Sequence, residues 1–279
     1  MLKQRIMSAV VMVLVFLGVL LLPNPFQVAF FALVVLVAAW EWSNLAGLQR
    51  RLYRYLYLVL VGGALSVFFS YFDVTSGLAS LSGQTLLAVV VGFWAVALLW
   101  VMGYPSSRIL WGTTFMRSAM GLFVVLGSWL ALALLSYERN AMALILYLVA
   151  LVAAADTGAY FAGKALGKHK LAPAVSPGKT VEGFAGGMLA SVAVAFLCYQ
   201  FGVSGGIALL PWLLLSLSAA LSSALGDLME SMVKRHRGIK DSGNILPGHG
   251  GIADRIDGLS AGAPVFVLGL MLLTQQLPV

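Results

Sequence analysis

The sequence predicts an all-α polytopic membrane protein of about nine transmembrane helices, and two observations carry this prediction. Its residues are 61% apolar and only 10% charged, with a mean hydropathy of +0.97. Apolar stretches of about 20 residues, the length that crosses about 30 Å of hydrocarbon, recur from end to end. This composition excludes an ordinary soluble domain, and the single Cys198 excludes an intrachain disulfide or a cysteine metal cluster.

Polar interruptions divide the apolar stretches into nine expected helices, with no separate soluble domain and no internal repeat. They lie at about 6–22, 26–43, 56–72, 84–102, 118–136, 141–163, 183–201, 207–230 and 260–277. Counts of eight or ten stay open, because the segments near Trp94 and Phe184 are rich in glycine or small residues. We expect the first run to be an uncleaved helix, since no small-residue cleavage site follows it.

Lysine and arginine fall on one side of this topology, and short loops rich in them stay cytoplasmic. The N-terminal tail and every second loop carry Lys3, Arg5, Arg50, Arg51, Arg54, Arg108, Arg117, Lys164, Lys168, Lys170, Lys179, Lys234, Arg235, Arg237, Lys240 and Arg255. Arg139 falls on the opposite side. We therefore expect a cytoplasmic N-terminus and a C-terminus outside. The net charge of +7 then suits anionic lipid headgroups and phosphorylated solutes.

Acidic residues gather in the C-terminal half. Seven of the ten follow position 150, namely Asp156, Glu182, Asp227, Glu230, Asp241, Asp254 and Asp257. A carboxylate inside the bilayer costs about 2.5–3.5 kcal/mol, so each one needs a partner or a role. We therefore divide the chain into scaffold helices at 1–140 and a catalytic region at 141–279. Its two cytoplasmic polar loops are expected at 164–182 and 231–259.

Asp227 and Glu230 are three residues apart at the end of an apolar helix, which places both carboxylates on one face. That spacing can hold a divalent cation between them or with neighbours. Glu230 is also four residues before Lys234, so an ordinary ion pair stays open for it. The more deeply placed Asp227 favours a functional role.

Glycine and proline exclude a continuous helix over 234–257. The Gly248–Gly251 run can bring backbone N–H groups close to a phosphate, while neighbouring lysines and arginines bind its oxygens. His249 within the run is an acid, a phosphate donor or a hydrogen-bonded turn residue. Asp254 and Asp257 are again three apart and begin a new helical pattern, with Arg255 on another side.

The other polar loop, at 156–183, carries lysines, a serine and a threonine that are typical phosphate contacts. Its Ser176–Thr180 segment is not a P-loop, because Ala174 stands where the first glycine is required and no strand precedes it. Asp156 is either a functional residue or a buried, hydrogen-bonded one. Mg²⁺ held by carboxylates beside basic residues is the combination that nucleotidyl transfer needs.

These residues resemble the signature of the phosphatidate cytidylyltransferases, or CDP-diacylglycerol synthases. The chain matches it at Ser231, Lys234-Arg235, Lys240-Asp241, Pro247-Gly248-His249-Gly250-Gly251 and Asp254-Arg255-Ile256-Asp257. Asp156, Ala159-Tyr160, Ser176-Pro177, Lys179-Thr180 and Glu182-Gly183 are similar to a second region of the family. The resemblance covers roughly residues 150–260, whereas the first 140 match only as apolar spans.

The resemblance implies that CTP and phosphatidic acid yield CDP-diacylglycerol and pyrophosphate in a Mg²⁺-dependent reaction, with a second cation left open. As metal ligands it implies Asp227 and Asp254, supported by Glu230, Asp241 and Asp257. As catalytic residues it implies Asp227, Asp254, Lys234, Arg235 and His249. As substrate-binding residues it implies Ser176, Lys179, Thr180, Glu182, Lys240, Gly250, Gly251, Arg255, Asp156 and Tyr160. A homodimer in a bacterial cytoplasmic (inner) membrane, with its site facing the cytoplasm, completes the expectation.

Two rival classes are weighed against this interpretation, and nucleic acid is not an expected partner. A CDP-alcohol phosphotransferase needs a spaced Asp-Gly-x-x-Ala-Arg motif that this sequence lacks, and a prenyltransferase also uses aspartates at helix ends. A transporter would place its carboxylates at mid-bilayer with access to both sides. Here they are expected at the cytoplasmic end, beside phosphate-binding loops.

Overall fold

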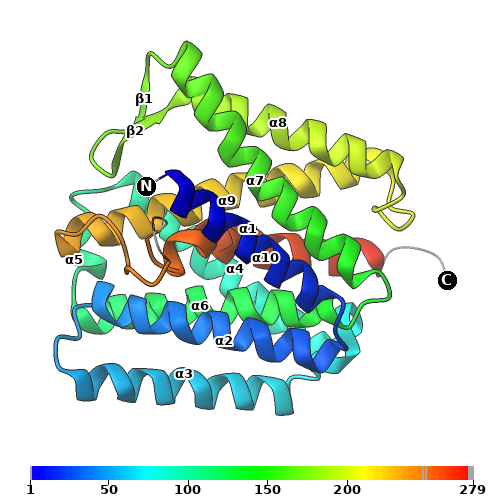
Figure 1. The fold of residues 1–279 in the computed structure, drawn as a ribbon, viewed down its shortest axis with the longest axis horizontal. Coiled ribbons are helices and arrows are strands. Elements are labelled where there is room, and N and C mark those ends of the chain that lie inside the picture. The colour runs from blue at the N-terminus through cyan, green and yellow to red at the C-terminus, as the bar shows by residue number, and fades with distance from the viewer. Residues whose placement is uncertain (1, 247, 249, 276–279) are drawn as a thin grey trace.

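The computed structural model describes residues 2–246, 248 and 250–275 and is almost entirely helical (Figure 1). Its elements are α1 (Leu2–Leu20), α2 (Asn24–Leu45), α3 (Arg51–Tyr71), η1 (Val74–Ala79), α4 (Leu81–Met102), α5 (Arg108–Trp111), α6 (Thr114–Ser136), α7 (Ala141–Leu166), β1 (Lys170–Ala172), β2 (Ser176–Thr180), α8 (Val181–Gln200), α9 (Leu209–Arg237) and α10 (Ala253–Thr274).

Eight helices within the described residues are long and apolar enough to cross a membrane, and α1 adds a shorter apolar stretch at Ile6–Leu20. The all-α polytopic fold class is therefore confirmed, and the chain is an integral membrane protein with multiple spans. The direction of insertion stays a prediction.

Helix ends differ from expectation where polar residues are helical. We expected the loop to begin after 230, but α9 continues to Arg237 and ends at Gly238, whose φ is +76°. Basic residues fill that last turn, where they interact favourably with the helix dipole, and glycine adopts the left-handed end without a Cβ penalty. Lys234 and Arg235 thus lie on a helix rather than in a loop. At the other side of the loop, α10 begins at Ala253 rather than near 260.

The loop expected at 164–182 contains a small hairpin that hydropathy did not indicate. Strands β1 and β2 pair antiparallel, with Lys170 opposite Thr180 and Ala172 opposite Ser176. Val181 N donates to the carbonyl of His169 at 2.9 Å, so the hairpin runs straight into α8. This arrangement places the hairpin beside the ends of α7 and α9 (Figure 1).

The core lies around α6, which packs against α2 on one side and against α10 on the other. Its residues from Val124 to Ala131 are all buried, whereas α3 buries little and faces outward. Helices α7 and α8 pair through small residues: Gly158, Gly186 and Gly187 lie against the partner helix's backbone or alanines. Such small residues let membrane helices approach closely.

Glycine at position 121 of α6 is required by the packing of α2 and α3. An added methyl there would overlap the Trp42 indole and the Tyr57 hydroxyl. We expect Gly121→Ala to destabilise the fold by about 1–3 kcal/mol, the usual cost of overpacking. Gly92→Ala in α4 is the control, because nothing lies within 4 Å of its added Cβ. Thermal unfolding in detergent measures both, and equal midpoints would rule out this packing.

Candidate active site

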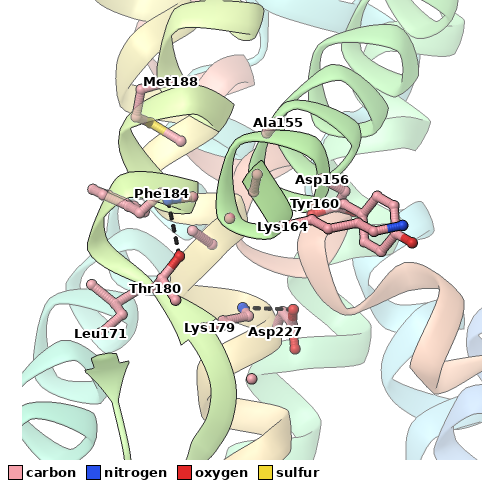
Figure 2. A pocket seen from close by; sticks show the side chains of 15 residues that line it. Ala155, Asp156, Tyr160, Lys164, Leu171, Lys179, Thr180, Phe184, Met188 and Asp227 are labelled. Atoms are coloured by element: carbon pink, nitrogen blue, oxygen red, sulfur yellow. Dashed lines mark hydrogen bonds and ion pairs between the residues drawn. The ribbon is translucent and has the colours of Figure 1, made fainter. Parts of the chain in front are cut away.

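The polar residues of the C-terminal half meet at one end of the bundle, around the C-terminal turns of α9. A cavity of about 440 Å³ lies between α7, β2, α8 and α9 (Figure 2). Its polar wall consists of Asp156, Tyr160, Lys164, Lys179, Thr180 and Asp227, and its apolar wall includes Phe184, Met188 and Ala224. Three helices and the hairpin thus contribute to one site that is polar on one side and apolar on the other.

Lys179 and Asp227 form the central ion pair of this cavity, with 2.6 Å between Nζ and Oδ2 (Figure 2). About a third of each side chain is exposed, so the pair can exchange partners with a ligand. The Ser231 hydroxyl donates to the other oxygen of Asp227 at 3.2 Å, one turn further along α9. Asp227 is therefore held from two sides while remaining open to the cavity.

A second cavity, of about 240 Å³, adjoins the next turn of α9 and shares Ser231 with this arrangement. Its lining is Ser231, Lys234, Arg235, Lys240, Asp241, Asp254 and Arg255. Residues 227, 231 and 234 recur at helical spacing, so one face of α9 contributes polar groups to both cavities. The two cavities therefore lie one after the other along this helix.

Lys234 is the centre of a buried ion network. Its Nζ lies 2.7 Å from Asp254 Oδ1 and 3.2 Å from Glu230 Oε1, and at most 11% of any of the three side chains is exposed. Charges at this depth are tolerated only when they are paired, because desolvation is expensive. The open alternative for Glu230, an ion pair with Lys234, is thus present, together with a second acid from α10.

Asp254 also fixes the loop that precedes α10. Its Oδ2 accepts the backbone N–H groups of Ser242 at 3.0 Å and Gly251 at 2.9 Å. Gly250 has a φ of +83°, and Leu246 N donates to its carbonyl at 2.9 Å. One carboxylate therefore contacts Lys234 with one oxygen and closes the loop with the other.

Helices α9 and α10 cross with their backbones in contact. A Cβ at Gly226 would overlap the carbonyl of Asp257, so only glycine fits there. Asp257 Oδ1 accepts the N–H of Gly258 at 2.7 Å. Its charge acts on Glu230, and the charge of Asp227 acts on both Asp257 and Asp156. Five carboxylates from α7, α9 and α10 thus share one electrostatic environment with two lysines.

Thr180 and Glu182 fasten the hairpin to α8. The Thr180 hydroxyl accepts the N–H of Gly183 at 3.1 Å and caps the helix. Glu182 accepts the N–H groups of Lys168 and His169, and its Oε1 lies 2.6 Å from His169 Nδ1. Arg235 Nε donates to the Val175 carbonyl at 3.3 Å. These contacts hold the strand that carries Ser176 and Lys179.

Three of the remaining expected residues line the second cavity. Lys240 and Asp241 are exposed at its edge, and Arg255 lines it. Tyr160 lies in the first cavity with 61% of its side chain exposed, next to Lys164. His249 lies outside the described residues.

The donor set of the site suits a hard cation, because such ions prefer oxygen ligands and carboxylates from α7, α9 and α10 gather here. Within the described residues, no three acidic, histidine or cysteine side chains are already arranged around an ion position. Lysine ammonium groups instead contact Asp227, Glu230 and Asp254. A divalent cation that binds these carboxylates has to replace such contacts.

Sequence reasoning missed Glu41, which lies in α2 and belongs to the half that we expected to be scaffold. Its side chain is buried and contacts Ser242 and Ala253 beside Asp254. The sequence did offer a signal for Glu41: it is a lone carboxylate between two tryptophans in an apolar helix, and such a group requires a partner.

Comparison with known proteins shows the relatives of this chain. The profile of the Cytidylyltransferase family matches residues 3–273. A phosphatidate cytidylyltransferase of Pseudomonas aeruginosa is 44% identical over 267 residues, 95% of this chain and 96% of the relative. Those of Haemophilus influenzae and Bacillus subtilis are 38% and 32% identical, over 95% and 91% of this chain and 97% and 92% of the relatives.

The network around Lys234 generates a stability prediction. Lys234→Met leaves Glu230 and Asp254 without their shared cation, and breaking a buried pair from one side costs about 3–5 kcal/mol. We expect a clearly lower midpoint of thermal unfolding in detergent. Lys170→Met on the exposed face of β1 is the matched control and should unfold like the unchanged protein. A Lys234→Met midpoint equal to that of the control would contradict the buried network.

Proposed function

This chain belongs to the cytidylyltransferase family, and we propose that the two cavities along α9 are the place where it performs the family's reaction. It is a phosphatidate cytidylyltransferase, which joins CTP to phosphatidic acid and yields CDP-diacylglycerol and pyrophosphate. The observation that carries the placement is the row of acid–lysine contacts on one face of α9, from Lys179–Asp227 to Lys234–Asp254.

The lipid substrate fits the first cavity. Its apolar wall continues into a further cavity of about 520 Å³, which shares Leu171, Phe184 and Ala224 with it. The further cavity is lined mainly by apolar residues of α4, the hairpin turn and α9. Acyl chains would lie along this apolar surface, which places the phosphate of phosphatidic acid beside Lys179 and Asp156 at the polar wall.

The nucleotide fits the second cavity. Lys234, Arg235, Lys240 and Arg255 supply positive charge for its phosphates, and guanidinium groups bind phosphate oxygens in pairs. Gly250 and Gly251 lie directly beside Asp254, which lines this cavity. The two substrates would then meet at Asp227, which lines the first cavity, and at Ser231, which lines the second and donates to Asp227.

We assign Asp227 and Asp254 as the leading ligands of Mg²⁺, with Glu230 and Asp257 behind them and Asp241 at the edge. Such an ion would neutralise the charge that develops on the nucleotide phosphates during transfer. Binding of the ion would compete with the Lys179 contact at Asp227 and with the Lys234 contact at Asp254. Lys179, whose pair with Asp227 is about a third exposed, would then be available to phosphate oxygens.

The bond changes are those of a nucleotidyl transfer. An oxygen of the phosphatidic acid phosphate forms a bond to the α-phosphorus of CTP, the bond from that phosphorus to the β-phosphate oxygen breaks, and pyrophosphate leaves with the electron pair. The attacking phosphate is already ionised near neutral pH, so no general base is required. The chain's residues therefore act by positioning two polyanions and by offsetting their repulsion.

Charge distribution supports an active site that faces the cytoplasm of a bacterial inner membrane. The basic residues of the sequence concentrate at the end of the bundle where both cavities lie, as cytoplasmic loops do. CTP is dissolved in that compartment. We also propose that two copies of the chain form a homodimer in this membrane.

The reaction itself is tested with purified protein, labelled CTP and phosphatidic acid in mixed micelles with Mg²⁺. We expect labelled CDP-diacylglycerol and one pyrophosphate for each turnover. Omitting phosphatidic acid should abolish both products. CTP hydrolysis without lipid product would contradict the proposed transfer.

Asp227→Asn and Asp254→Asn test the assignment of the carboxylates. Each removes a carboxylate charge that would hold the Mg²⁺ ion offsetting phosphate repulsion, so we expect kcat to fall by about two orders of magnitude or more. Asp73→Asn is the control, because Asp73 is an exposed residue before η1 at the opposite end of the bundle. Both site variants turning over like the control would refute the assignment.

Mg²⁺ binding is tested without turnover. After chelation, added Mg²⁺ should raise the midpoint of thermal unfolding of the unchanged protein, because a ligand stabilises the state that binds it. The same addition should leave Asp227→Asn and Asp254→Asn nearly unshifted. An equal Mg²⁺-dependent shift in all three proteins would place the ion elsewhere.

A further inference from the structure

Glu41 connects the N-terminal half of the chain to the loop at 238–252. Only 2% of its surface is exposed. Its Oε2 accepts the Ser242 hydroxyl at 3.0 Å and the N–H of Ala253 at 2.8 Å. Both contacts span about two hundred positions of sequence, so they form only when α2 and the C-terminal region are assembled.

The partners of Glu41 are also the supports of Asp254. Ser242 donates its N–H to Asp254 Oδ2 and its hydroxyl to Glu41, so one residue bridges the two carboxylates. Ala253, the other partner, is the first residue of α10 and precedes Asp254 directly. Fixing these two residues fixes the position from which Asp254 reaches Lys234.

Two glycines let the loop close over Glu41. A Cβ at Gly243 or at Gly251 would overlap the Glu41 carboxylate. Gly251 also donates its N–H to Asp254 at 2.9 Å. The loop is therefore shaped around both acids, and a side chain at either glycine would separate it from Glu41.

The segment Trp40–Leu45 that carries Glu41 is itself held firmly. Arg54 donates to the Trp40 carbonyl and the Ser43 hydroxyl, each at 2.8 Å. Arg117 donates to the Leu45 carbonyl at 2.9 Å. Arg237 donates to the Asn44 carbonyl at 3.1 Å, which ties α2 to the last turn of α9. Three arginines thus satisfy the carbonyl end of α2 and make it a rigid support.

We propose that Glu41 is a positioning residue of the active site, which holds Ser242 and the start of α10 so that Asp254 is presented to the substrates. This inference rests on the proposed function, because it assigns Glu41 to the same site. Glu41 acts through Ser242 and Ala253 and touches no substrate. Supporting residues of this kind typically change metal affinity or activity by about 10–100-fold when they are replaced.

Glu41→Gln and Glu41→Ala form the test series, with purified protein in nanodiscs. Gln retains a carbonyl acceptor, so we expect less than about a 10-fold loss in kcat/KM for CTP. Ala leaves the Ser242 hydroxyl and the Ala253 N–H unpaired, so we expect a loss of about 10–100-fold together with weaker Mg²⁺ binding. Ser242→Ala removes the hydroxyl contact to Glu41 and replaces Glu41→Ala in the test if that variant does not fold.

Glu138 supplies the matched control for a merely structural carboxylate. Its Oε1 accepts the N–H of Leu78 at 2.7 Å and lies against Gly77, so it also holds a distant loop opposite a glycine. Helices α2 and α6 run antiparallel, because Arg117 donates to the Leu45 carbonyl and Trp129 donates to the Val28 carbonyl. Glu138 follows the end of α6 and therefore lies at the opposite end of the bundle from Glu41. Glu138→Ala should lower stability but leave KM for CTP and Mg²⁺ affinity unchanged.

A spin label reports loop order directly. Asn244 is an exposed loop residue, and Cys198 is the single cysteine, so a label at Asn244→Cys in a Cys198→Ser background is specific. We expect its mobility to increase with Glu41→Ala or Ser242→Ala and to stay unchanged with Glu138→Ala. Unchanged mobility and unchanged kinetic constants in an active Glu41→Ala protein would overturn the inference. Failure of the proposed function would be distinct, because the unchanged protein would then form no CDP-diacylglycerol.

Discussion

Lys234 lies between Glu230 of its own helix and Asp254 of α10, and this buried ion network determines how the two helices meet. Charges at a membrane-level helix end are stable only with partners, so neither helix can shift without exposing one of them. Gly226 allows the backbones to touch where Asp257 follows. The contacts of Lys234 with Glu230 and Asp254 thus connect the end of α9 to the start of α10 and fix the ends of the loop between them.

The network also reaches α2, on the N-terminal side of the division expected at 140, and that division stays a prediction. One oxygen of Asp254 contacts Lys234, while the other accepts the backbone N–H of Ser242 in the loop. Glu41 holds the same loop residue through the Ser242 hydroxyl. Arg117 and Arg237 fasten the segment that carries Glu41 to α6 and α9. The rigidity of the site therefore depends on residues from both ends of the sequence.

Hydropathy predicted the membrane helices because long apolar runs have few alternatives, but it misplaced their ends where charged residues continue a helix, as at Lys234 and Arg237. Motif spacing brought out Asp227 and Asp254, since carboxylates among basic and glycine residues are rare in apolar chains. Glu41 was missed because only the tertiary fold brings it to Ser242. The hairpin before α8 was missed because β1 and β2 are short and carry no hydrophobic alternation.

The contrast between the two lysines indicates how the site can be stable and reactive at once. Lys234 is nearly buried with its acids, so its pairing maintains the fold, whereas Lys179 and Asp227 are each about a third exposed at the first cavity. An exposed ion pair contributes little to stability, so exchanging it for phosphate and metal contacts costs little. The exchangeable pair also lies where the apolar cavity begins, so under the proposed function the phosphate-binding groups would be next to the surface suited to acyl chains.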